Sequence, residues 1–168
     1  IRDSNPTKKA PTVTKALVVL NVLVFLYTVF LPYSDLRSFT QQFALIPARI
    51  SEGEHFYTII TAMFLHGGLG HIFGNMLFLW IFGDNVENSL GHLKFLLFYL
   101  FCGLAGFLLQ YVTGPFSTVP MLGASGAIAG VLGSYLVLYP NARVEIIVPL
   151  FIFFTTFTVP ARFMLIYW

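Results

Sequence analysis

Long apolar runs separated by short polar segments dominate the chain, and five of them approach the length of a membrane span. A hydrocarbon core about 30 Å thick takes roughly 20 helical residues to cross. The runs cover Thr14–Leu31, Tyr57–Phe82, Leu93–Val112, Ser125–Leu138 and Glu145–Phe157, the last with a restart after Pro160. Each run is predicted to be a helix, so the expected fold class is all-α, a polytopic membrane helical bundle with five spans present.

Composition agrees with this pattern. Apolar residues make up 57% of the chain and charged residues only 10%, whereas soluble domains average about 25% charged residues. The first run carries no charge from Ala16 to Tyr33, and no A-x-A-like cleavage site follows it. It is therefore expected to be a retained span and not a removed signal peptide. Since no linker interrupts the chain, residues 1–168 are expected to form one transmembrane domain.

The basic residues predict an orientation, because Lys and Arg accumulate in short cytoplasmic loops. With the N-terminus inside, the inner set is Arg2, Lys8, Lys9, Lys15, Lys94 and Arg143, and the outer set is Arg37, Arg49 and Arg162. Six inner residues against three outer ones favour a cytoplasmic N-terminus. Basic residues do not form a stripe interleaved with aromatics, so no nucleic acid is expected as a partner.

The longest predicted loop, Pro32–His55, carries apolar residues at helical spacing at Phe39, Phe43, Leu45 and Ile46. This spacing is typical of a helix half embedded in the bilayer. Its simplest interpretation is a lid or buttress lying on the outer face.

A hydroxyl nucleophile is predicted at Ser125, within Gly123-Ala124-Ser125-Gly126. The flanking glycines allow a sharp turn and close approach of a substrate, and the first N–H groups of the helix have no partner inside it. The fourth run has 14 residues, about 21 Å of helix against a core of about 30 Å. Ser125 is therefore expected below the outer surface, in a hydrated cavity. The alternative is that Ser125 is one more small packing residue.

Two polar residues of the second run are candidate partners. His71 and Asn75 lie four residues apart and share one helix face, where both could donate hydrogen bonds to an oxyanion together with the Ser125 N–H. The alternative is that they join helices as buried hydrogen-bonding groups. His66 lies near the helix mouth, and an interfacial or structural role is expected for it. The pattern is not HExxH, so no metal site is expected.

In this order, His66, His71 and Asn75, the glycine-bounded run Gly83–Gly91, and Gly123–Gly126 resemble the rhomboid family of intramembrane serine proteases. The resemblance implies a helical bundle without a cofactor, embedded in the bilayer, and a bacterial inner-membrane location. It implies that Ser125 is the nucleophile and that His71, Asn75 and the Ser125 N–H are the oxyanion donors. Gly123, Ala124, Gly126 and His66 would form the substrate-binding loop region. The substrates would be single-span membrane proteins, cut near their outer ends after small residues.

The family's general base is a histidine on a sixth helix, and no histidine follows His92 in this sequence. The chain is therefore expected to be truncated after five of six spans and to be inactive alone, because a serine without a base is a poor nucleophile. A rhomboid-like pseudoprotease that binds transmembrane clients without cutting them is the alternative. A small transporter or channel is not supported, because no intramembrane charge relay or discontinuous repeat pair is found.

Overall fold

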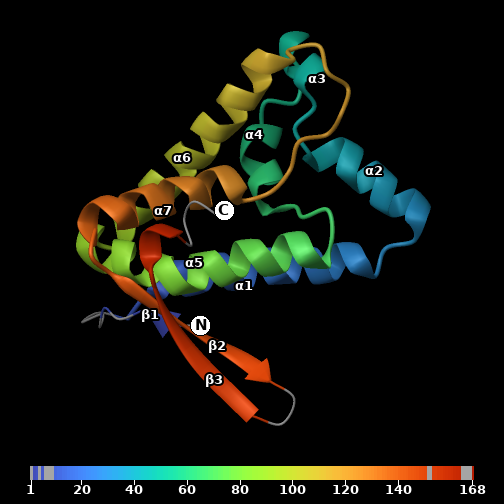
Figure 1. Ribbon diagram of the computed structural model, residues 1–168. Helices are drawn as coiled ribbons and strands as arrows, with labels where there is room; N and C mark the ends of the chain where they lie inside the picture. The colour runs from blue at the N-terminus through green and yellow to red at the C-terminus, as the bar shows by residue number, and fades with distance from the viewer. Residues whose placement is uncertain (1, 4, 6–9, 151–152, 164–167) are drawn as a thin grey trace.

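In the computed structural model, which describes residues 2–3, 5, 10–150, 153–163 and 168, helices form the body of the molecule (Figure 1). The helices are α1 Thr12–Val29, α2 Tyr33–Phe43, α3 Pro47–Ser51, α4 Thr58–Thr61, the 3-10 helix η1 Ala62–Phe64, α5 Leu69–Leu90, α6 His92–Thr113 and α7 Ser125–Leu138. The strands are β1 Arg2–Asp3, β2 Arg143–Leu150 and β3 Phe153–Pro160. The predicted membrane helical bundle is confirmed.

Helix α5 is the centre of the bundle. It lies beside α1 and packs against α6 and α7, while α6 and α7 pack on each other (Figure 1). The core between these helices is apolar and fully buried at Phe82 of α5, Phe95 of α6, and Ile128 and Val131 of α7. Helix association in lipid depends on such close packing, because lipid tails are as apolar as the side chains.

The predicted spans are only partly continuous. Within the described residues, α1 and α6 are long and apolar enough to cross a membrane, and the pair Thr58–Phe64 and Leu69–Leu90 is bent by 92° at its break. The break contains His66, Gly67 and Gly68, and glycine disfavours a helix interior. The sequence predicted His66 within the second span, Tyr57–Phe82. In the structure His66 lies in the loop before α5.

The prediction of a fifth span over Glu145–Phe157 is wrong, because the described residues of this segment belong to strands β2 and β3. They pair antiparallel from Arg143 opposite Pro160 to Leu150 opposite Phe153, and β1 pairs with the other edge of β2. The hairpin projects away from the helices (Figure 1). The segment is rich in β-branched and aromatic residues, which favour strands, and Pro149 disfavours a continuous helix. Of the predicted restart after Pro160, residues 164–167 lie outside the described residues.

The long connection Pro32–His55 contains two helices, α2 and α3. The predicted helix is confirmed for Phe39 and Phe43, which lie on α2, whereas Leu45 and Ile46 lie in the non-helical link between α2 and α3. Rings pack in series from Tyr27 to Phe39, at 5.5 Å between centroids, then to Phe43 at 4.6 Å and Tyr57 at 6.4 Å. Leu45 exchanges two backbone hydrogen bonds with Met121, of 3.0 and 2.7 Å. The connection is thereby tied to the loop that leads into α7.

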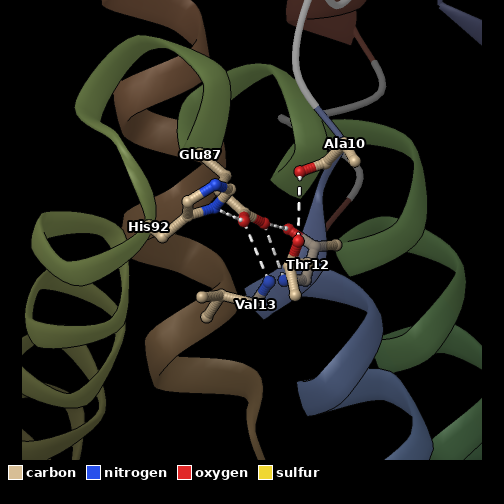
Figure 2. A network of polar contacts seen from close by, with 6 residues as sticks. Ala10, Thr12, Val13, Glu87 and His92 are labelled. Atoms are coloured by element: carbon tan, nitrogen blue, oxygen red, sulfur yellow. Dashed lines mark hydrogen bonds and ion pairs between the residues drawn. The ribbon is translucent and has the colours of Figure 1, made fainter.

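A buried carboxylate joins α1 to α5 (Figure 2). Glu87 is 1% exposed, and its oxygens accept the Val13 N–H at 2.9 Å, the Thr14 N–H at 2.7 Å and the Thr14 hydroxyl at 2.6 Å. His92 Nδ1 lies 2.5 Å from the same carboxylate. The first N–H groups of a helix lack internal partners and favour a negative charge. Glu87 therefore serves as the cap of α1 from a distant part of the chain.

Candidate catalytic site

Ser125 is the first residue of α7, and the turn that precedes it is closely fixed. Gly123 has a φ of +120°, which side chains with a Cβ rarely adopt, and its N–H donates to the Ala62 carbonyl at 2.9 Å. Ala124 is completely buried, whereas Ser125 is exposed. The hydroxyl thus stands at the mouth of a helix whose first N–H groups lack intrahelical partners.

Gly123 lies directly against His71. A Cβ at Gly123 would come within 2.8 Å of both Cε1 and Nε2 of the His71 ring. A side chain at this position is therefore excluded for two reasons, the backbone conformation and the space that the imidazole occupies. The glycine of the motif allows the histidine of α5 to reach the turn before Ser125.

The hydrogen bonding of His71 determines which nitrogen can donate. The Gly67 N–H points at Nδ1 of His71 at 3.4 Å, so Nδ1 is the acceptor. In a neutral imidazole the other nitrogen, Nε2, then carries the proton. This nitrogen is the one that faces Gly123, so the His71 ring presents an N–H donor on the Ser125 side.

Asn75 is a buried polar residue of α5. Its side chain is 1% exposed, and neither its amide nitrogen nor its carbonyl oxygen has a hydrogen-bond partner among the described residues. A buried polar group without a partner costs about 1–3 kcal/mol. The nitrogen lies 3.9 Å from the position that a Cβ at Gly123 would take. The amide is therefore directed toward the turn before Ser125 and not into a helix contact.

These groups surround one cavity of about 290 Å³, lined by Gly70, His71, Gly74, Asn75, Ser125 and Trp168. The predicted triplet Ser125, His71 and Asn75 is thus brought together. Sequence reasoning missed Gly70, Gly74 and Trp168. The glycines had a signal, because they recur four residues apart next to His71 and Asn75. Trp168 had none; its ring packs on Phe78 at 4.7 Å between centroids.

Ser125 also borders a second, smaller pocket of about 90 Å³. Its lining consists of Gly103, Gly106, Phe107, Gln110, Leu122, Gly123, Ser125 and Gly126. The pocket exists because four of its lining residues are glycines without side chains. Phe107 and Gln110 of α6 form part of its wall. The serine therefore lies between a polar cavity on the α5 side and a small pocket on the α6 side.

The remaining predicted site residues support this geometry. His66 is 8% exposed and packs edge-on against the His71 ring, with 5.1 Å between centroids. Gly126 lies against α6, where a Cβ on it would be 3.1 Å from the Cα of Gly106. His66 holds the imidazole of His71, and Gly126 holds the start of α7 close to α6.

Comparisons with known proteins identify similar chains. The Rhomboid domain family matches residues 53–168. The chain is 35% identical over 130 residues to "Rhomboid protease GluP" of Bacillus subtilis (strain 168), an alignment that covers 75% of this chain and 24% of that protein. It is 39% identical over 94 residues to "Putative rhomboid protease YdcA" of the same organism, which covers 55% of this chain and 46% of that protein.

A eukaryotic relative is "Rhomboid protein 1, mitochondrial" of Saccharomyces cerevisiae (strain ATCC 204508 / S288c), 36% identical over 95 residues. That alignment covers 54% of this chain and 28% of the yeast protein. The chain spans between about a quarter and a half of the length of these relatives.

Proposed function

Because the chain belongs to the rhomboid family, we propose that residues 1–168 are the rhomboid-like transmembrane domain of an intramembrane serine endopeptidase, without the helix that carries the general base. Ser125 is the nucleophile, and the oxyanion hole consists of His71, Asn75 and the Ser125 N–H. The relatives named as proteases support serine protease chemistry at the level of the family.

The observation that carries the proposal is the unpartnered amide of Asn75 in the cavity beside Ser125. An amide that joined two helices would have a partner in the neighbouring helix. An amide that stabilises a transition state needs a free donor in the resting enzyme, because its partner is the oxygen that becomes negative during the reaction.

In the proposed reaction the Ser125 oxygen attacks the scissile carbonyl and its proton passes to a general base. The negative oxygen then accepts hydrogen bonds from Nε2 of His71, from the Asn75 amide and from the N–H of Ser125. His71 does not serve as the base in this scheme, because its Nδ1 accepts the Gly67 N–H and its Nε2 is protonated. The family resemblance assigns the base to a histidine on a helix outside residues 1–168. The exposed small residues Ala129 and Gly133 of α7 would accommodate such a helix.

We propose single-span membrane proteins as substrates, cut near their outer ends. The pocket of about 90 Å³ beside Ser125 supports a small residue before the cut, since its volume excludes large side chains. The protein would be a multi-pass enzyme of a bacterial inner membrane with a cytoplasmic N-terminus.

Covalent labelling tests the assignment. The full-length protein should react with a fluorophosphonate, and Ser125→Ala should abolish the labelling. Ser134→Ala, on the same helix, is the matched control and should label normally. Labelling that persists in Ser125→Ala would remove this serine from its role. Full-length protein that binds a transmembrane client but neither labels nor cuts it would instead be a rhomboid-like pseudoprotease.

A further inference from the structure

A second cavity of about 290 Å³ lies between α6 and the α3–α4 region. Its lining is apolar except for one hydroxyl: Leu45, Ile50, Phe56, Ile59, Leu104, Phe107, Leu108 and Tyr111. In Figure 1, α3 and α4 lie beside α6 along its C-terminal half. This acyl groove, as we name these eight residues, contains neither Ser125 nor its proposed oxyanion donors.

The size of the groove limits its occupant. One turn of an α-helix with side chains is about 10–12 Å across and about 5.4 Å high, which is roughly 400–600 Å³. A groove of about 290 Å³ can hold only part of such a turn. An unbranched apolar chain fits, because it is narrower than a helix and needs no polar partner.

The groove opens to the lipid. Helix α6 is long and apolar enough to cross a membrane, and its Leu104 and Leu108 are 41% and 57% exposed. These leucines are lipid-facing residues and at the same time form the outer edge of the groove, with Phe56 opposite at 56% exposure. The groove is therefore continuous with the surface that the bilayer covers.

One end of the groove is polar. The Tyr111 hydroxyl lies 2.8 Å from Oγ of Ser51, which also donates to the Pro115 carbonyl at 2.6 Å. Tyrosine is enriched where hydrocarbon meets the headgroup region, since its ring is apolar and its hydroxyl is polar. A chain that enters at Tyr111 would run from headgroup level inward along Leu108 and Leu104.

We propose that the acyl groove binds one acyl chain of a phospholipid. The lipid is a resident ligand of the domain, with its headgroup near Ser51 and Tyr111 and its chain against Phe107 at the back of the groove. Phe107 is only 8% exposed, so a lipid chain reaches it by entering the groove and not by covering the surface.

Photolabelling tests the proposal. The full-length protein is reconstituted in vesicles of phosphatidylcholine and phosphatidylglycerol that contain phosphatidylcholine with a diazirine in its acyl chain. After irradiation, mass spectrometry should find label on Leu45 and Ile59, which line the groove and do not line the pocket beside Ser125. Leu108→Trp, which fills the opening, should lose this label. Leu109→Trp is the matched control, because Leu109 is the next residue on α6, is 70% exposed and does not line the groove.

Label confined to exposed positions such as Leu109, or equal label in both variants, would show surface lipid only and overturn the proposal. Leu104→Trp provides a second blocking variant and should also lose the label. The assay needs no proteolysis, so it gives the same result with Ser125→Ala and is independent of the proposed enzymatic function.

Discussion

At the scale of the residue, the partners of a buried polar group separate function from architecture. Glu87 and Asn75 lie on the same helix and are each 1% exposed. The carboxylate of Glu87 accepts hydrogen bonds from the start of α1 and pairs with His92 (Figure 2). The amide of Asn75 has no partner among the described residues and lines the cavity of Ser125. The first arrangement holds helices together, and the second holds a donor ready for a ligand.

Asn75→Ala should therefore lower turnover without unfolding the protein. Loss of one oxyanion donor typically costs about 100- to 1000-fold in turnover, and no hydrogen bond within the described fold is lost here. The measurement is cleavage of a transmembrane substrate by the full-length enzyme, with kcat and KM determined separately beside a melting temperature. kcat should fall while KM and the melting temperature stay nearly constant.

Asn21→Ala is the control, because Asn21 is also fully buried but lies on α1, where its amide donates to the Leu17 carbonyl at 2.7 Å. It should lower stability and leave turnover per folded molecule unchanged. If Asn75→Ala instead lost about 0.6 to 2 kcal/mol of stability, as expected for an amide that joins helices, with normal turnover, the oxyanion assignment would fail.

At the scale of the element, hydrophobic runs predicted helices well and breaks within them poorly. The run Ser125–Leu138 coincides with α7, because glycine and proline punctuate both of its ends. The run Tyr57–Phe82 divides at Gly67-Gly68, where the apolar pattern continues although the backbone turns by 92°. The helix predicted over Glu145–Phe157 was wrong, because periodicity alone does not distinguish an apolar strand from a buried helix. The β-branched residues of that segment were the available signal.

The candidate site was predictable where local motifs carry it. Ser125, His71 and Asn75 were found because polar groups in a membrane span are rare and usually face a cavity. The role of Glu87 was not predictable, because its partners Val13 and Thr14 are 74 and 73 positions away. Only the packing of α1 on α5 brings them together.

Glu87→Gln should weaken the attachment of α1. The glutamine amide has the shape of the carboxylate but no charge. Its NH₂ group is a hydrogen-bond donor and would face the donors of Val13 and Thr14 that now bind a carboxylate oxygen. Hydrogen bonds to charged groups contribute about 1.5–3 kcal/mol each, so a fall in melting temperature is expected. Thermal unfolding in detergent measures it, with Glu52→Gln, an exposed residue at the end of α3, as control. Equal melting temperatures of the two variants would show that the Glu87 contacts contribute nothing to stability.

At the scale of the whole molecule, the site lies at one end of the bundle. Helix α7 has 14 residues, about 21 Å against a hydrocarbon core of about 30 Å. The loop before it is held by Leu45 at Met121 and by the Ala48 N–H, which donates to the Ser117 carbonyl at 3.0 Å. The α2–α3 connection is therefore joined to the loop that leads to Ser125 at the start of α7. Of the basic residues that predict the orientation, Lys8 and Lys9 lie outside the described residues.

This arrangement makes the orientation testable with two cysteines. Ala10 precedes α1 and Thr118 lies in the loop before α7, and both are exposed. In a Cys102→Ala background, which removes the single native cysteine, Ala10→Cys and Thr118→Cys are treated on intact cells with a maleimide that cannot cross the membrane. The excess of Lys and Arg on the N-terminal side predicts that the loop lies outside. Thr118→Cys should therefore be modified, and Ala10→Cys should react only after the cells are opened.

Modification of Ala10→Cys on intact cells, with Thr118→Cys protected, would reverse the orientation. The cavity of Ser125 would then open to the cytoplasm, and the proposed cleavage near the outer ends of substrates would be ruled out.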